Sequence, residues 1–354
     1  MKIVRNSFVP LYIQLEELIK VKIQKGEYLY DQPIPSGEEF SKKYGISKIT
    51  VRQAFNNLVK ENLLYGAQGK GTFVKKPVPK LKRYNILISK HSFHQHSFYF
   101  DIIRGCEAMD SGETRLSIQT YDEKDEPFSS AIRKPDRDGL LVMELFTPEK
   151  NIPALKKTGI PFVLVGHYSL DEDICAVYPN AYRSTFQITE HLAKKGHRKI
   201  ALLGGNHSKG ISARDFLRGY CDALAAHHIP FKSEWCKESN WTAKDGYNLT
   251  KELLRLRNLP TAIFAGDDTI AVGVIKALKE KGIRIPQDMA VAGFNDLDLA
   301  TIVEPHLTTM RIPRFEIGKA AAELLMKLVD GEEVEEKQIV FEPELIIRAS
   351  SERR

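Results

Sequence analysis

A chain of 354 residues has no apolar run approaching the roughly 20 residues that span a bilayer and no signal-peptide core, which predicts a cytoplasmic protein of two or three domains and excludes a membrane protein. Its four cysteines, Cys106, Cys175, Cys221 and Cys236, have no metal-binding spacing, which excludes a disulfide framework and a zinc site. The net charge of +6 is uneven: residues 1–83 hold 16 Lys and Arg against 7 Asp and Glu, so we expect either a polyanionic partner there or a solvated basic face.

The first predicted element is an amphipathic helix over residues 11–25, LYIQLEELIKVKIQK. Its apolar residues recur at helical spacing, and they are Leu11, Leu15, Leu18, Ile19 and Ile23. Gly26 can end this helix.

Two further helices follow, joined by a short glycine turn. Ser36 is a suitable N-cap for a helix through EEFSKKYG, Gly45 supplies the turn, and Ser47 can cap the next helix, KITVRQAFNNLVKEN. An apolar stripe on this last helix leaves four polar residues facing outward near its start: Lys48, Thr50, Arg52 and Gln53. Because arginine and glutamine make bidentate contacts with guanine or adenine edges, the arrangement predicts a DNA-binding helix-turn-helix.

The glycine-rich stretch YGAQGKGTFV, Tyr65–Val74, has two candidate roles. A phosphate-binding Walker loop requires a glycine, four further residues and then Gly-Lys-Ser/Thr, but Leu64 stands at the first glycine position and Gly71 replaces the hydroxyl residue. The flanking runs LLY and TFV predict a β-hairpin instead, which is either an ordinary exposed turn or a wing that touches DNA.

The order of helix, helix-turn-helix and glycine-rich hairpin resembles the winged-helix DNA-binding domain of the GntR family of bacterial repressors. The resemblance covers residues 8–76 through PLYIQLEELIKVKIQKGEY, IPSGEEFSKKYGISKITVRQAFNNLVKENLL and GAQGKGTFV, and it implies a domain at residues 1–74. It implies contacts with phosphates or base edges in the major groove from Ser36, Lys48, Thr50 and Arg52, and minor-groove contacts from the wing tip at Gln68, Gly69 and Lys70. Ser47, Gln53 and Thr72 complete the expected DNA contacts. Gly37 precedes Glu38 where the family commonly has Ser-Glu directly after the proline, which leaves the role of Glu38 open.

Residues 75–83, KKPVPKLKR, are basic and proline-spaced, which predicts an extended linker. From Tyr84, short apolar runs alternate with amphipathic segments of helix length. The runs are YNILIS, GLLVME, FVLVG, KIALLGG, TAIFAG and MAVAGF, and the segments include FDIIRGCEAM, RSTFQITEHLAKK, RDFLRGYCDALAAH, GYNLTKELLRL and TIAVGVIKALKEKG. This alternation predicts a doubly wound, parallel α/β fold that binds ligands beyond the carboxyl ends of its strands.

Residues 84–354 resemble the effector-binding and dimerisation domain of the LacI/GalR family, which is similar to the two-lobed periplasmic sugar-binding proteins. The motifs are GHRKIALLGG, RDFLRGYCDAL, PTAIFAGDDTIAVGVIKALKEKGIRIPQDMAVAGFNDLDLA, PHLTTMRIPRFEIGKAAAELL and FEPELIIR. A GntR-type head joined to a LacI-type body is a known hybrid, and FEPELIIR resembles its arabinose-repressor subfamily. The resemblance implies two α/β lobes that close on a small sugar, with L-arabinose as the first expectation.

The same resemblance suggests effector-binding residues: His96, Phe98, Arg183, Arg214, Asp267 and Asn295. Asp267 and Asn295 would supply planar groups that bond neighbouring hydroxyls, and Phe98 an aromatic face. Phe216 replaces the family's sugar-contacting arginine, which leaves Arg214 as a substitute, and Arg183 falls near the place of an aspartate. These exchanges leave an acidic or phosphorylated sugar as an alternative ligand. Plainer roles are a core position for Phe98, a surface position for Arg183 and a helix cap for Asp267.

Together these patterns predict a sugar-responsive transcriptional repressor that binds a palindromic operator in double-stranded DNA as a homodimer. We expect no catalytic residue, no cofactor and no metal, because His91, His94 and His96 alternate without an acidic or thiol partner at matching spacing. Two other classes stay open: an enzyme acting on a sugar or nucleotide, and a protein that binds nucleic acid without sequence preference.

Overall fold

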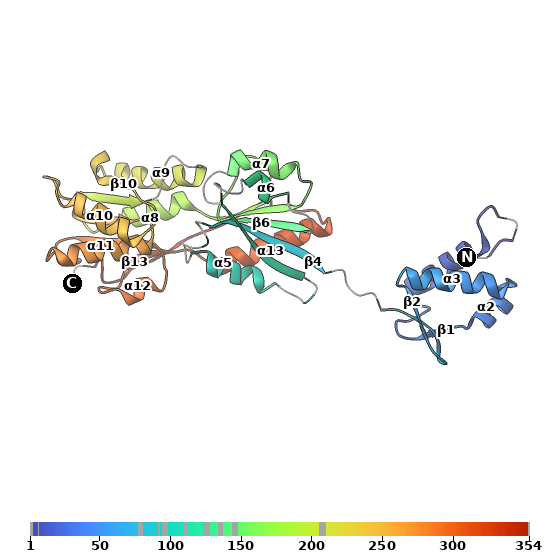
Figure 1. Cartoon of the computed structure of the whole chain (residues 1–354). Coiled ribbons are helices and arrows are strands. Elements are labelled where there is room, and N and C mark those ends of the chain that lie inside the picture. Colours follow the sequence, from blue (N-terminus) through green and yellow to red (C-terminus); the bar gives the residue numbers. More distant parts are fainter. Residues whose placement is uncertain are drawn as a thin grey trace. The chain divides into compact units, whose positions relative to one another are not determined.

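The computed structural model describes the whole chain except residues 1, 2, 6, 77–80, 91, 92, 94–97, 110, 111, 113, 123–127, 134–136, 144–147, 205–209, 353 and 354. It divides into two compact units, Met1–Lys80 and Leu81–Arg354, which we call the head and the body (Figure 1). No helix among the described residues is long and apolar enough to cross a membrane.

The head is a winged helix, as predicted. Its helices are α1 (Leu11–Gln24), α2 (Gly37–Tyr44) and α3 (Lys48–Lys60), and its strands are β1 (Pro33–Ile34), β2 (Leu64–Ala67) and β3 (Gly71–Val74). The three strands form an antiparallel sheet in the order β1-β3-β2. The sequence patterns did not predict β1, a two-residue strand that pairs with β3 through Ile34 and Thr72.

Local chemistry explains where the head helices begin and end. At the start of α2, the Ser36 hydroxyl accepts a hydrogen bond from the Glu39 amide, and the Glu39 carboxylate accepts one from the Ser36 amide, which is a capping box. Gly45 ends this helix in the left-handed conformation, at φ 64°. The Ser47 hydroxyl accepts from the Thr50 amide and so starts α3.

The body contains two six-stranded sheets, one in each lobe. The first sheet is wholly parallel in the order β14-β8-β7-β6-β4-β5, with β4 (Lys82–Ser89), β5 (Thr114–Tyr121), β6 (Gly139–Met143), β7 (Phe162–Val165), β8 (Ala176–Pro179) and β14 (Gln338–Phe341). The second has the order β10-β9-β11-β12-β13-β15, with β9 (Ile200–Gly204), β10 (Cys236–Glu238), β11 (Ala262–Ala265), β12 (Ala290–Asn295), β13 (Thr308–Arg311) and β15 (Glu344–Ile346). Of the strands that the structure describes in this sheet, β15 alone runs antiparallel to its neighbour.

Helices flank both sheets (Figure 1). The first lobe carries α5 (Phe98–Glu107), α6 (Phe128–Ala131), α7 (Pro148–Lys156) and α13 (Arg314–Asp330). The second carries α8 (Ala181–Lys194), α9 (Ile211–Ala226), α10 (Ala243–Leu253), α11 (Asp268–Glu280), α12 (Leu299–Ile302) and the 3₁₀ turn Ser233–Trp235. The predicted doubly wound, two-lobed α/β architecture is therefore confirmed. Lys82 and Arg83, at the end of the segment that the sequence indicates as a linker, belong to β4.

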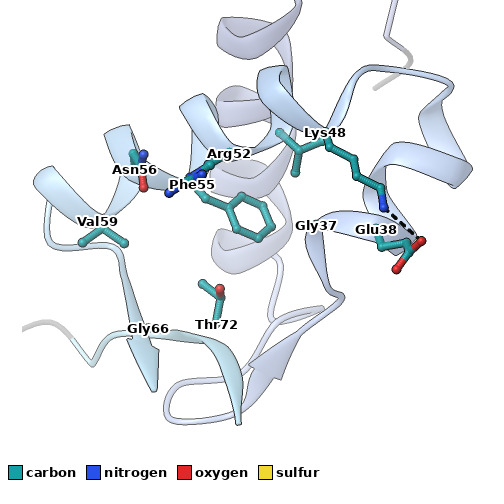
Figure 2. A pocket seen from close by; sticks show the side chains of 10 residues that line it. Gly37, Glu38, Lys48, Arg52, Phe55, Asn56, Val59, Gly66 and Thr72 are labelled. Atoms are coloured by element: carbon teal, nitrogen blue, oxygen red, sulfur yellow. Dashed lines mark hydrogen bonds and ion pairs between the residues drawn. The ribbon is translucent and has the colours of Figure 1, made fainter. Parts of the chain in front are cut away.

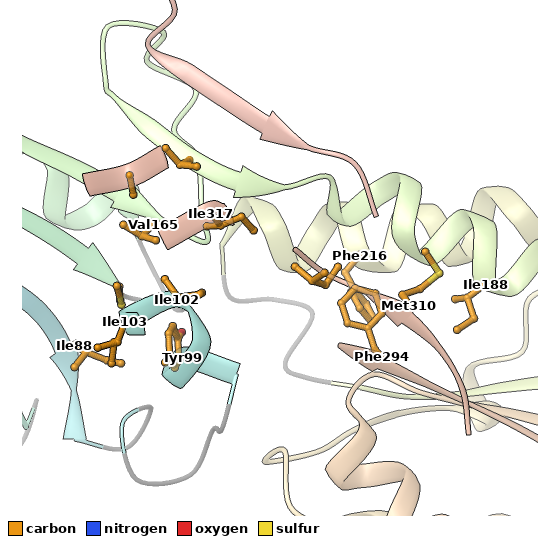
Figure 3. Packing of buried hydrophobic residues seen from close by; sticks show 14 of the residues in the cluster. Ile88, Tyr99, Ile102, Ile103, Val165, Ile188, Phe216, Phe294, Met310 and Ile317 are labelled. Carbon is orange, nitrogen blue, oxygen red and sulfur yellow. The ribbon is translucent and has the colours of Figure 1, made fainter. Parts of the chain in front are cut away.

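Among the described elements, the chain crosses between the lobes at three places: from β8 to α8, from β13 to α13 and from β14 to β15. The crossing at Ile312 and Pro313 matters most for the site, because it returns the chain from the second sheet to the first lobe, where α13 packs against α5 and β7. Buried apolar residues line both sides of these crossings, among them Val165 and Ile317 in one lobe and Phe216 and Met310 in the other (Figure 3).

Candidate DNA interface and effector site

Helix α3 presents a polar face because its opposite side is buried in the head core. Val51, Ala54 and Leu58 are at most 1% exposed, whereas Arg52 and Gln53 are exposed. Since successive helix residues are turned by about 100°, Gln53 lies on the side of the helix opposite Val51 and Arg52 lies on the flank between the two sides. Both side chains are exposed to solvent.

Three of the predicted DNA contacts also hold the helix starts together. The Ser36 hydroxyl is engaged in the α2 capping box. The Ser47 and Thr50 hydroxyls share a hydrogen bond of 2.8 Å, in addition to the cap that Ser47 provides. These hydroxyls set the position of the outward-facing residues, whatever contacts they make with a phosphate.

A pocket of about 390 Å³ lies between α3 and the wing (Figure 2). Arg52, Phe55, Asn56 and Val59 line it from the helix, and Thr72 lines it from the wing strand β3. At its other end, Lys48 Nζ donates to Glu38 Oε1 at 3.1 Å, and both side chains are more than half exposed. The ion pair gives Glu38, whose role the sequence left open, a contact with the start of α3.

The wing tip is exposed. Gln68, Gly69 and Lys70 are all exposed, and the turn is closed by a hydrogen bond from the Lys70 amide to the Ala67 carbonyl. Gly69 and Gly71 have φ values of 73° and 111°, a backbone region that favours glycine and that this tight turn requires. The tip therefore presents exposed backbone together with the Gln68 amide and the Lys70 cation.

Two outward residues of α3 were missed by the sequence patterns. Ile49 is 80% exposed in the first turn, and Asn56 is exposed two turns later. A helical projection from the buried Val51, Ala54 and Leu58 identifies both, because each lies on the opposite side of the helix.

In the body, the strand ends of the second lobe bring Asp267 and Asn295 together. Asp267 follows β11, Asn295 ends β12, and the Asn295 amide donates to Asp267 Oδ2 at 2.7 Å. Both residues are buried, and burial raises the pKa of Asp267 against the opposing effect of hydrogen bonds from Thr269 and Asn295. Asp267 also caps α11 through the Thr269 amide, so the predicted cap is present together with the contact to Asn295.

Asp268 lies next to this pair and is fully buried. Its carboxylate accepts from Thr309 Oγ1 and from the Leu297 amide, each at 2.7 Å. Burial and the neighbouring Asp267 carboxylate raise the pKa of Asp268 to about 8, so it carries a proton at neutral pH.

Arg314 joins the second-lobe strand ends to the first lobe. It begins α13, and its guanidinium donates to Asp101 Oδ2 on α5 from Nε at 3.2 Å and from Nη2 at 2.8 Å. The same side chain donates to the Asn295 carbonyl through Nη1. Asn295 has φ 100°, a strained value for a residue other than glycine, and such strain is typical of ligand sites.

Phe98, the aromatic residue expected in the first lobe, begins α5 and is partly buried. The ring of Phe98 packs edge-on against the ring of Tyr99, with the two ring centroids 5.3 Å apart, and it also packs against the main hydrophobic core. Part of this side chain therefore occupies a core position, the plainer of its two expected roles. His96, the second residue expected here, lies outside the described residues, as do His91 and His94.

A second set of interlobe contacts was not predicted. His167 and Tyr168 follow β7, and both meet the start of α9 in the other lobe: Tyr168 Oη donates to Asp215 Oδ2 at 2.5 Å, and His167 Nδ1 lies 3.5 Å from Ser212 Oγ. His167 is 4% exposed, its Nε2 has no hydrogen-bond partner among the described residues, and burial lowers its pKa to about 4. The sequence signal that could have identified His167 and Tyr168 is their position directly after the apolar run FVLVG, because ligand-binding groups follow the carboxyl ends of parallel strands.

The two candidate arginines lie in different surroundings. Arg183 is exposed on α8, where its Nε pairs with Glu342 Oε2 at 3.2 Å, which matches the plainer surface role. Arg214 is also exposed, in the first turn of α9, where its charge acts on the nearby Tyr168. Within the described residues, no group of His, Cys, Asp and Glu side chains is arranged to hold a metal ion.

Comparisons with known proteins match both parts of the chain. Residues 11–74 match the model of the bacterial regulatory proteins of the gntR family, and residues 189–351 match the periplasmic binding protein-like domain. The arabinose metabolism transcriptional repressor of Geobacillus stearothermophilus is 30% identical over 365 residues, covering 98% of this chain and 99% of the relative. The repressor PurR of Actinobacillus pleuropneumoniae is 31% identical over 66% of this chain and 70% of its own length.

Among solved structures, a LacI family transcriptional regulator from Enterococcus faecium with bound ribose has a TM-score of 0.66 at 25% identity, covering 76% of this chain and 98% of the other. The structural likeness thus covers about three quarters of the chain, whereas the arabinose metabolism repressor matches nearly all of it. The chain belongs to the family of transcriptional repressors that join a GntR-type winged-helix head to a LacI-type, periplasmic-binding-protein-like body, the family of the arabinose metabolism repressors.

Proposed function

We propose that this protein is a transcriptional repressor that binds operator DNA through its head, as a homodimer, and is released when a small neutral sugar binds between the lobes of its body. L-arabinose is the first candidate ligand. The observation that carries the proposal is the similarity to an arabinose metabolism transcriptional repressor over nearly the full length of both chains.

The head supports the DNA-binding part of this proposal. The basic excess of the chain lies in residues 1–83, and α3 exposes Arg52 and Gln53, whose side chains suit bidentate contacts with guanine and adenine. The candidate phosphate and groove contacts are Ser36, Ser47, Lys48, Thr50, Thr72 and the wing tip at Gln68, Gly69 and Lys70. Since operators of two-fold symmetry match dimeric proteins, we propose a palindromic site.

The interlobe groups support a neutral ligand. Asp267, Asn295 and His167 offer carboxylate, amide and uncharged imidazole groups, all of which bond hydroxyls. In the part of the chain that the structure describes, the buried His167 Nε2 has no hydrogen-bond partner, so it is available to bond a sugar hydroxyl. The Enterococcus faecium regulator of similar fold holds ribose, a neutral pentose.

An acidic sugar is the second candidate, and Arg214 favours it. Its guanidinium lies near Tyr168, at the interlobe contact between β7 and α9. Arg183 supports this candidate less, because Glu342 already neutralises it at the surface.

Thermal unfolding of the purified protein tests the ligand class, because a ligand that binds the native state raises the melting temperature. We expect L-arabinose to raise it in a concentration-dependent way and to weaken binding to a selected operator duplex. A rise with uronates or sugar phosphates but not with neutral pentoses would favour the acidic ligand. Turnover of any of these sugars would instead support an enzyme.

A further inference from the structure

We propose that Ile49 determines part of the operator sequence by contacting the 5-methyl group of a thymine in the major groove. The inference rests on the proposed function, because it assigns one specific contact to the operator-binding face. It adds a residue that polar base-contact patterns do not identify.

The position of Ile49 on α3 carries the first step. The helix begins at Lys48, and Ile49 lies about 160° around it from the buried Val51, so its side chain points directly away from the head core. In helix-turn-helix proteins the N-terminal residues of this helix contact base edges. Ile49 therefore lies where a base contact is made.

The exposure of Ile49 carries the second step. Ile49 is 80% exposed, whereas Ile46, three residues earlier, is 5% exposed in the head core. Its neighbours in the first turn are polar and already engaged: Lys48 pairs with Glu38, and Thr50 bonds Ser47. An aliphatic side chain in this setting gains free energy only when a partner removes it from water.

The chemistry of the groove identifies the partner. In the major groove, the base edges present donors and acceptors, and the one apolar group among them is the thymine methyl. An isoleucine side chain has no donor or acceptor, so it cannot contribute to the hydrogen bonding of guanine, cytosine or adenine. Its β-branch also holds χ1 in one rotamer within a helix, so little conformational freedom is lost when it meets the methyl.

The experiment begins with selection of a consensus operator from a random-sequence duplex library by the full-length protein. Each thymine of the consensus is then replaced in turn by uracil, which removes only the methyl group. We expect one thymine in each half-site at which uracil weakens binding about fourfold, the effect of one buried methyl group. With Ile49→Ala, thymine and uracil at that position should bind equally.

Val59→Ala is the matched control, because Val59 is an exposed aliphatic residue near the other end of the same helix. We expect this variant to keep the thymine-to-uracil difference, and both variants to melt within a few degrees of the unsubstituted protein.

Two results would overturn the inference while leaving the repressor function intact: no thymine at which uracil weakens binding, or a difference that survives in Ile49→Ala. A library that yields no preferred sequence would overturn operator binding itself, and the base contact with it.

Discussion

At the scale of single residues, the outward face of α3 combines side chains of different chemistry. Arg52 and Gln53 are suited to hydrogen bonds with purines, and Ile49 has only apolar surface. The hydroxyls of Ser47 and Thr50 also secure the start of the helix. Specificity is therefore expected to depend on few side chains held by a capped helix.

Replacement of Arg52 by alanine should weaken operator binding by about 1–3 kcal/mol, because a bidentate base contact is lost. Binding to an unrelated duplex should change much less, since that binding depends on phosphate contacts. Fluorescence anisotropy with both duplexes measures the two effects. Lys60→Ala, at the other end of the helix, is the control, and an equal loss on both duplexes would show that Arg52 contacts phosphate only.

Asp268 gives the body a pH-dependent stability. The native state holds the proton up to about pH 8, whereas an ordinary aspartate releases it near 3.8, so the native state binds more protons between these values. The free energy of unfolding should therefore fall as the pH rises from about 4 to 8 and level off above that range.

Asp268→Asn should remove this dependence, because an amide can donate to Thr309 and accept from the Leu297 amide without titrating. In denaturant unfolding at several pH values, the free energy of unfolding of the variant should rise relative to that of the unsubstituted protein by about 1 kcal/mol per pH unit through the middle of the range. The exposed Asp298→Asn is the control. A constant difference between pH 5 and 8 would contradict the raised pKa.

At the scale of elements, α5 and α13 form one tightly packed pair. A Cβ atom on Gly105 would lie 2.0 Å from the Phe315 carbonyl oxygen, and one on Gly318 would lie 1.9 Å from the Ile102 carbonyl oxygen. Backbone thus meets backbone at both contacts, and no flexible side chain can move aside.

Gly318→Ala should therefore destabilise the body by about 1–3 kcal/mol, the usual cost of overpacking. Lys319→Ala, the next residue on the exposed side of α13, should change stability by less than about 0.5 kcal/mol. Urea unfolding of both variants makes the comparison. Equal free energies of unfolding for the two variants would mean that α5 and α13 can move apart at little cost.

At the scale of the whole molecule, Arg314 is suited to transmit ligand binding from one lobe to the other. It contacts Asp101 of α5 and the backbone of Asn295, whose side chain bonds Asp267. A ligand that changes Asn295 would move the paired helices α5 and α13 with it. Such coupling is a difference in affinity between two states of the molecule.

Arg314→Gln should reduce the effect of the sugar on operator affinity at least about fivefold, while the sugar still raises the melting temperature. Operator titrations with and without saturating sugar measure this ratio. Arg104→Gln is a matched control, because Arg104 also pairs with Asp101, at 3.1 Å, but is 71% exposed on α5. An unchanged ratio in Arg314→Gln would exclude this route.

Features that depend on local residue order could be predicted from the sequence. The caps at Ser36 and Ser47, the glycine end at Gly45 and the winged-helix order follow from short patterns, because capping and turn formation involve residues a few positions apart. The alternation of apolar runs and amphipathic segments likewise predicted the α/β body. Short strands such as β1, β10 and β15 were not predicted, since they form only against a neighbouring strand.

What only the tertiary structure decided is which distant residues meet. Asp101 and Arg314 are 213 residues apart, and His167 meets Ser212 across the lobes, while Arg183 pairs with Glu342. These contacts depend on where the chain crosses between the two sheets and on which strands end at the same edge. The sequence by itself determined the local elements and the family, because both lie in contiguous patterns, whereas the interlobe site arises from long-range packing that no contiguous pattern specifies.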